Sequence, residues 1–280
     1  TIISDFPNYH CDACKKETVY PMCETCNNAC RKMNYCPDCD NNYTTKCEEH
    51  ERNFDFKKKK IDVRYYLDIA QKKSGVRLDE SGLIIKGIRG TSSKDHSCEN
   101  LAKGLLRAKH NLNVNKDGTI RYDMTEMPIT HFKPKEIGIS VEVAKRMGYE
   151  QDVFGKALEN DDQVITMFPH DVILPSCFDS QDERADDVFI RVSKFVDDEF
   201  EKIYGLPRVH NFQKREDLIG SFVVCIAPHI CTATVGRIIG FSRTQVFLAS
   251  PYMHAAMRRD CDGDEAAVIF LTDLLLNFSR

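Results

Sequence analysis

Cysteine spacing constrains the fold of this chain more than any other feature. Thirteen cysteines occur in the sequence, and eight of them fall between residues 11 and 47. Three Cys-x2-Cys pairs lie in that stretch, and such a turn directs both sulfurs toward one tetrahedral metal ion. This clustering indicates metal binding rather than disulfides, and it favours a reducing, cytoplasmic compartment. The candidate zinc ligands are Cys11, Cys14, Cys23, Cys26, Cys30, Cys36, Cys39 and Cys47.

These cysteines predict two zinc ions in a zinc-ribbon-like module at the N-terminus. The metal would hold together a segment too small for a core of its own, and direct contact with a partner molecule is the alternative role. An interleaved arrangement of ligands stays open, as does His50 in place of Cys30 or Cys47. The favoured ligand sets are Cys11, Cys14, Cys23 and Cys26 for one ion and Cys30, Cys36, Cys39 and Cys47 for the other.

A second cluster of chemistry-bearing residues is the sequence RRDCDGDE, which begins at Arg258. An extended backbone would place Asp260, Asp262 and Asp264 on one face. Three carboxylates that close repel one another unless a cation lies among them, and their hard oxygens favour Mg²⁺ or Mn²⁺. Arg258 and Arg259 add positive charge where a phosphate would lie. Carboxylate-held metal beside arginine is typical of nucleotidyl transfer.

Three other interpretations of the aspartate stretch compete with a catalytic one. An acidic surface turn is the first. A calcium loop of the EF-hand kind needs Gly at its sixth position and Glu at its twelfth, where this sequence has Glu265 and Leu271, so it is excluded. A solvated helix N-terminus is the third. The nearly continuous apolar run over residues 266–278 favours a carboxylate cluster set against a buried element.

Residues 236–280 closely resemble the catalytic segment of the large subunit of archaeal family D DNA polymerases. The shared motifs are GRIIGF, PY-x-HAA, RR-x-CDGDE and LLNFSR, and GLLRAKH and residues 127–138 also match. The resemblance implies a double-psi β-barrel polymerase core in which Asp262 and Asp264 bind the catalytic Mg²⁺. The family's Asn falls on Asp260, which brings the loop closer to the RNA polymerase form.

The resemblance also implies a function, DNA-directed DNA polymerisation in replication, on a DNA primer-template with dNTPs. It implies a heterodimer with a small proofreading subunit, and a sliding clamp as a further partner. We expect a piece of a longer chain, because it has no initiator Met and ends inside an apparent helix. Alone it should be inactive, because the resemblance implies that half of a barrel pair is absent. Departures at Ser250, Met253, Met257 and Ala266 leave open a zinc-dependent DNA-binding or assembly module with an inactive polymerase site. Asp260 leaves open an RNA-polymerase-like or primase-like enzyme.

The formal net charge of −4 means that nucleic-acid contacts must come from local basic patches. Two candidates lie four residues apart on a predicted basic helix. Three others alternate along a predicted extended segment, as suits a phosphate backbone, and one lies in the GRIIGF motif. Ordinary solvated charge is the alternative for all of them. Beyond the aspartate loop, these candidates are Lys103, Arg107, His131, Lys133, Lys135 and Arg237.

The remaining pattern predicts a mixed α+β fold without a membrane span, since no run of eighteen apolar residues occurs. Apolar spacing predicts helices over 62–73, 99–110, 139–148 and 183–204. Residues 216–227 are apolar enough for a buried helix or strand, and short apolar runs predict barrel strands over 163–174 and 245–249. The expected organisation is a zinc module over 1–56, a connecting α/β segment over 57–126 and a barrel region over 127–280, incomplete at its C-terminus.

Overall fold

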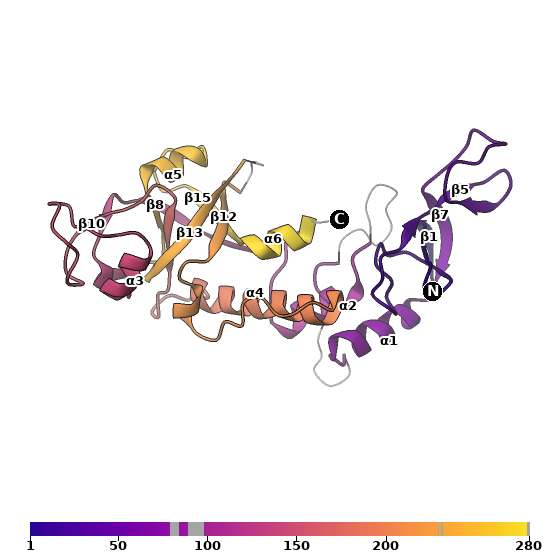
Figure 1. Cartoon of the computed structure of the whole chain (residues 1–280), viewed down its shortest axis with the longest axis horizontal. Helices are drawn as coiled ribbons and strands as arrows, with labels where there is room; N and C mark the ends of the chain where they lie inside the picture. The colour runs from indigo at the N-terminus through magenta and orange to yellow at the C-terminus, as the bar shows by residue number, and fades with distance from the viewer. Residues whose placement is uncertain (79–83, 89–97, 229, 231, 279–280) are drawn as a thin grey trace. The chain divides into compact units, whose positions relative to one another are not determined.

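The computed structural model describes residues 1–78, 84–88, 98–228, 230 and 232–278 (Figure 1). The chain divides into two compact units. The first unit comprises Thr1–Gly118 and Phe195–His210, and the second comprises Thr119–Lys194 and Asn211–Ser279. The predicted boundaries at residues 56 and 126 both fall inside paired β-structure, so the structure divides the chain elsewhere.

Short strands build the N-terminal part of the first unit. Strand β1 (Ile2–Pro7) pairs antiparallel with β7 (Phe56–Ile61), which contains the Lys57–Lys60 run. A three-stranded sheet has the order β3-β2-β4, and β5 pairs with β6. Their bounds are Tyr9–Cys11 for β2, Lys16–Thr18 for β3, Arg31–Lys32 for β4, Asn34–Cys36 for β5 and Asn41–Tyr43 for β6.

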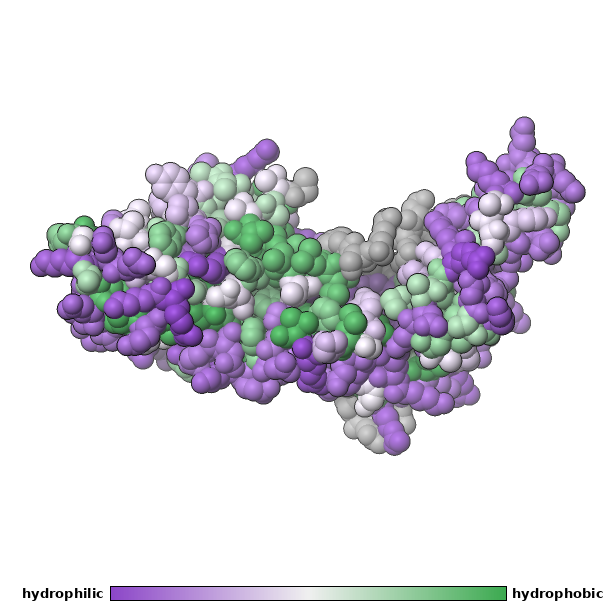
Figure 2. Space-filling model, viewed as in Figure 1, coloured by the Kyte–Doolittle hydropathy of each residue, from purple (hydrophilic) through white to green (hydrophobic). Residues whose placement is uncertain are grey.

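Little apolar surface is buried among these strands. One small cluster joins Phe6, Val19, Tyr20 and Cys98. Figure 2 shows mostly hydrophilic residues over the N-terminal strands. A segment with so small a core needs cross-links to hold its shape, and the cysteine clusters described below are suited to provide them.

The three longest helices lie close to their predicted positions. Helix α1 (Val63–Ser74) begins after Asp62, whose carboxylate accepts from the Arg64 N–H, and ends at Gly75 in the left-handed region. Helix α2 (Leu101–Lys109) is capped by the Asn100 side chain. Helix α4 (Ala185–Glu199) continues into one π-helical turn, Phe200–Tyr204, which ends at Gly205.

A closed barrel of six strands, in the order β11-β13-β12-β15-β8-β14, forms the second unit. The pairs β11–β13 and β8–β14 are parallel, and the other pairs are antiparallel. The ambiguous stretch over 216–227 forms a strand at Phe222–Ile226, because barrel neighbours pair with it on both sides, and its first residues belong to a 3₁₀ turn. The bounds are Arg121–Pro128 for β8, Asp171–Pro175 for β11, Phe222–Ile226 for β12, Ala233–Ser242 for β13, Phe247–Ala249 for β14 and Glu265–Phe270 for β15.

Shorter elements cover the barrel and build a second core cluster around Phe132, Ile165 and Ile239. The second glycine of GRIIGF allows a close approach here, because a Cβ at Gly240 would lie 2.8 Å from the Ile137 carbonyl oxygen. The bounds are His131–Phe132 for β9, Pro134–Ile137 for the 3₁₀ turn η1, Val141–Arg146 for α3, Ile165–Thr166 for β10, Arg215–Leu218 for the 3₁₀ turn η3, Pro251–Ala256 for α5 and Leu271–Phe278 for α6.

Within the described part of the chain, no helix has the length and apolarity needed to cross a membrane.

Candidate functional site

The aspartate loop is fixed to the barrel by the pairing of β15 with β8. In this ladder Glu265 lies opposite Thr125, and Ala266 lies opposite Met124. Just before β15 begins, the Asp264 carbonyl accepts from the Glu126 N–H at 2.9 Å. The register therefore places the end of the loop beside a residue of β8 that is far away in the sequence.

Three carboxylates meet at this point. Oxygens of Glu126, Asp262 and Asp264 all lie within 4.8 Å of one another. In an octahedral site with metal–oxygen distances near 2.1 Å, opposite ligands are about 4.2 Å apart, so small side-chain movements suffice to hold one Mg²⁺ or Mn²⁺. Glu126 is buried, Asp264 is half-buried and Asp262 is exposed, so the cluster is open to solvent on one side.

The loop does not run as the extended strand that the alternating aspartates predict. Arg258, Cys261 and Gly263 have φ values of 61°, 68° and 95°, so the backbone turns through the left-handed region three times. As a result, Asp260 is exposed and lies outside the carboxylate group. The expectation that Asp260, Asp262 and Asp264 share one face is wrong, because the backbone is not extended. The third member of the carboxylate group is Glu126 of β8.

Charges around the loop are arranged asymmetrically. Arg259 donates from Nη1 to Asp264 Oδ2 at 2.9 Å, whereas the Arg258 side chain is exposed. Burial raises the pKa of the Cys261 thiol, and the charges of Glu126, Asp260 and Asp262 act in the same direction. Cys261 is thus a neutral thiol beside the carboxylates at neutral pH, and it does not add to their negative charge.

Two residues of this site, Glu126 and His254, were missed by the sequence analysis. Strand β8 buries Tyr122, Met124 and Glu126 on alternate positions, so a carboxylate occupies the inward face of an otherwise apolar pattern. A glutamate at an inward, otherwise apolar position of a predicted strand could have marked Glu126 as a candidate. His254 lies on α5, whose first turn is capped by the Ser250 hydroxyl, and nothing local in the sequence links it to β8.

The cysteines form two metal-competent groups in the first unit. Ligand atoms within each group all lie within 4.8 Å of one another. The first group agrees with the favoured set, but His50 takes the place predicted for Cys30 in the second. Cys30 lies outside both groups, and its thiol donates to the Asn28 carbonyl at 3.7 Å. The groups are Cys11, Cys14, Cys23 and Cys26, and Cys36, Cys39, Cys47 and His50.

One thiol in each group is poised to ionise. A hydrogen bond from the Cys14 N–H lowers the pKa of Cys11 to about 6. A hydrogen bond with His50 likewise lowers the pKa of Cys47 to about 6. Thiolates are the form that binds zinc, so both groups fit the metal chemically.

Comparison with known proteins gives the family of the chain. The family model for the catalytic domain of DNA polymerase II large subunit DP2 matches residues 79–280. The chain belongs to the DNA polymerase II large subunit family. The resemblance noted for residues 236–280 is therefore confirmed.

Similar DNA polymerase II large subunits occur in several archaea. The Nanoarchaeum equitans protein is 40% identical over 99% of this chain and 25% of its own length. The Archaeoglobus fulgidus protein is 43% identical, over 96% of this chain and 23% of its own. The Pyrococcus furiosus protein is 42% identical, over 97% of this chain and 22% of its own length. The chain spans about a quarter of the length of the curated relatives it matches.

The basic face predicted for helix α2, formed by Lys103 and Arg107, is buried rather than presented to solvent. Lys103 is 6% exposed and forms ion pairs with Glu199 at 3.1 Å and Glu99 at 3.8 Å. Arg107 is fully buried, and its guanidinium contacts both carboxylate oxygens of Glu99 and the Gly118 carbonyl. The prediction that these two cations bind phosphate is corrected: buried carboxylates neutralise them inside the fold.

Arg237 of the GRIIGF motif is also held internally. Its Nε and Nη2 donate to Asp171 Oδ1 and Oδ2 at 2.8 and 2.9 Å, and Nη2 also donates to the Met147 carbonyl at 3.0 Å. Asp171 is fully buried and accepts another hydrogen bond from the Tyr149 hydroxyl. The guanidinium therefore balances a buried carboxylate, and the phosphate role predicted for Arg237 is corrected.

The three alternating basic residues remain on or near the surface. His131 and Lys135 are exposed and Lys133 is half-buried. They do not share one extended segment, because β9 ends at Phe132 and the 3₁₀ turn η1 begins at Pro134. Lys135 forms a surface ion pair with Asp162 at 3.5 Å, which is weak enough to exchange for another anion.

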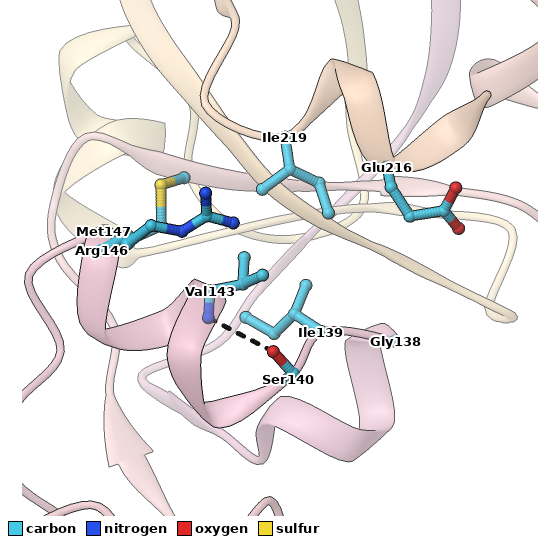
Figure 3. Close-up of a pocket in the computed structure, with 8 residues that line it drawn as sticks. All are labelled: Gly138, Ile139, Ser140, Val143, Arg146, Met147, Glu216 and Ile219. Carbon is cyan, nitrogen blue, oxygen red and sulfur yellow. Dashed lines mark hydrogen bonds between the residues drawn. The ribbon is translucent and has the colours of Figure 1, made fainter. Parts of the chain in front are cut away.

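Two surface pockets lie in the barrel unit. One, of about 560 Å³, borders the loop at Gly263 and is acidic; burial and then the charge of Glu265 raise the pKa of Asp123 there. The other, of about 470 Å³, lies between α3 and η3 (Figure 3). Its polar wall is formed by Arg146, Glu216 and Ser140, whose hydroxyl caps α3. None of its lining residues belongs to the carboxylate group, so it is no part of the site.

Proposed function

We propose that the chain carries the metal-dependent nucleotidyl-transfer centre of a DNA polymerase catalytic subunit that acts in DNA replication. The observation that carries the proposal is the convergence of the loop aspartates with a third carboxylate at the β8–β15 pairing. The membership of the chain in the DNA polymerase II large subunit family supports it.

Asp262 and Asp264 are the metal ligands in this proposal. One oxygen of Asp264 is engaged by Arg259, which orients the carboxylate and leaves the other oxygen for a cation. The exposed Arg258 supplies positive charge for a phosphate, and so do His131, Lys133 and Lys135. When bound, Mg²⁺ would activate the primer 3′-hydroxyl and offset charge on the transferring phosphate.

The proposal extends to the fold and to structural metals. Six closed strands with two parallel pairs support assignment of the barrel as double-psi. The two sulfur-rich groups support two zinc ions in a zinc-ribbon-like module, one held by cysteines alone and the other by three cysteines and a histidine. Zinc there would hold the N-terminal strands together.

The partners we propose follow from the family alone. They are a DNA primer-template with dNTPs, a small proofreading subunit that completes a heterodimer, and a sliding clamp. The function is that of a longer polypeptide, because this chain spans about a quarter of its relatives.

Primer extension by the full-length polymerase tests the proposed function, with Asp262→Asn as the perturbation. We expect extension to fall at least about 100-fold, since even outer-shell partners of metal ligands affect activity 10- to 100-fold. DNA binding should persist, because the substitution removes no basic residue. Asp260→Asn is the matched control, as it removes the same charge from outside the carboxylate group. Equal extension by Asp262→Asn and the unmodified enzyme would refute the proposal. Replacing dNTPs with NTPs in the same assay would show whether the enzyme incorporates deoxyribonucleotides or ribonucleotides.

A further inference from the structure

Glu126 is buried in a way that folding alone does not explain. The residue is 1% exposed, and its Oε1 has no hydrogen-bond partner among the described residues. An unpaired buried carboxylate oxygen is strongly unfavourable, whereas an apolar residue in the same inward position of β8 would be stabilising. The position therefore indicates a ligand that the carboxylate serves.

His254 fixes one half of that carboxylate. Its Nδ1 lies 2.7 Å from Glu126 Oε2, and both side chains are fully buried. A carboxylate only accepts, so Nδ1 carries the proton in this contact. The Phe247 ring packs edge-on against the imidazole at a centroid distance of 5.8 Å, which restricts its rotation.

The free half of the carboxylate belongs to the cluster with the loop aspartates. An oxygen of Glu126 lies within 4.8 Å of ligand oxygens of Asp262 and Asp264. Since Oε2 is engaged by His254, Oε1 is the oxygen left for a cation. The arrangement matches a metal-binding carboxylate that is oriented by a hydrogen bond from a neighbouring side chain.

We propose that Glu126 is a third protein ligand of the metal held by Asp262 and Asp264, and that His254 is the positioning residue that holds it in the ligating orientation. The inference rests on the proposed function, because it concerns the same metal. It adds a metal ligand from β8 to the two ligands from the loop before β15. The metal site would therefore depend on the pairing of these two strands.

Mn²⁺ affinity of the zinc-loaded chain, measured from the free-ion signal in electron paramagnetic resonance, tests this inference without relying on activity. We expect Glu126→Gln to weaken Mn²⁺ binding by about 10- to 100-fold. Its amide oxygen still accepts from His254, so the fold should persist, as thermal melting by circular dichroism would show. Asp123→Asn is the matched control, since it removes one carboxylate from the exposed side of the same strand and should leave Mn²⁺ affinity unchanged.

Two substitutions of His254 separate positioning from packing. His254→Leu fills space but removes the donor, and it should lower Mn²⁺ affinity about 10-fold or more. His254→Asn can keep an N–H near the position of Nδ1, so it should bind Mn²⁺ more tightly than His254→Leu. Equal affinity of both variants and the unmodified chain, alongside weakened binding by Glu126→Gln, would refute the positioning role.

Asp262→Asn distinguishes failure of this inference from failure of the proposed function. If Asp262→Asn loses Mn²⁺ while Glu126→Gln binds as tightly as Asp123→Asn, Glu126 is no ligand and only the further inference fails. If the unmodified chain binds no Mn²⁺, or Asp262→Asn binds it normally, the metal site itself is wrong and both proposals fail.

Discussion

The ion pair between Arg237 and Asp171 allows a sharp test of how the barrel is held together. Arg237→Ala would leave Asp171, which is fully buried, with its hydrogen bond from Tyr149 and a 3.3 Å contact between its Oδ1 and the Nε2 of the exposed His170. Removing one partner of a buried pair costs about 3–5 kcal/mol, because the remaining charge stays desolvated. We expect the lower end of that range, since the Arg237 side chain is 18% exposed and water can replace part of it. At roughly 2–4 °C per kcal/mol, the Tm should fall by at least about 6 °C.

Thermal melting followed by circular dichroism measures the effect, and Arg243→Ala is the control. Arg243 is exposed just beyond β13, so its loss should change the free energy of unfolding by no more than about 0.5 kcal/mol. In a double-mutant cycle, Asp171→Ala should cost less on the Arg237→Ala background than alone, because the two groups interact directly. A Tm for Arg237→Ala equal to that of Arg243→Ala would refute the reasoning, and weaker DNA binding at unchanged stability would restore the phosphate role predicted from the sequence.

Two further predictions concern the first unit. Burial raises the pKa of Asp198, but hydrogen bonds from His110 and Lys109 outweigh it and hold the pKa well below its usual range. The stabilisation from the ionised carboxylate is therefore complete above about pH 4 and is lost as the pH falls further. Asp198→Asn should make the free energy of unfolding depend less on pH below about pH 4. An unchanged pH dependence in acid titration by circular dichroism would contradict this. Chelation of zinc should remove amide hydrogen-exchange protection from strands β2–β6 and leave the barrel strands protected; continued protection of β2–β6 would show that their small core suffices.

Local signals predicted the helices well. Helix α1 was expected over 62–73 and spans Val63–Ser74, because an aspartate cap and a glycine in the left-handed region set both ends within the sequence itself. The apolar run over 216–227 had no such signal. A continuous apolar run suits a buried helix or strand equally, and only pairing with β13 and β15 decides for a strand.

The candidate site was predictable only as far as its ligands are adjacent in the sequence. Asp262 and Asp264 lie in one loop, so their motif was visible. Glu126 and His254 lie 128 residues apart and meet only through barrel closure. Asp260 lies outside the carboxylate group, because alternation implies a shared face only for an extended backbone, and this loop contains residues in the left-handed region.

The predicted phosphate-binding residues on α2 also depend on contacts that the local sequence does not reveal. Spacing places Lys103 and Arg107 on one face of α2, but spacing does not tell whether that face meets solvent or buried acids. Glu99 and Glu199 supply the acids, and Glu199 is distant in the sequence and fully buried. A cationic helix face indicates nucleic-acid binding only when the anions of the same fold do not neutralise it first.

The pairing of β8 with β15 gives the proposed metal site a structural consequence. The Glu126 N–H donates to the Asp264 carbonyl, while the side chains of the same two residues belong to the carboxylate group. Without a cation, the negative charges oppose the approach that this hydrogen bond requires. With a cation bound, the carboxylates are all attracted to it. A cation that binds only the folded barrel also stabilises the folded state by mass action. In the proposed site, metal binding would therefore be coupled to the pairing of β8 with β15, because Glu126 and Asp264 take part in both.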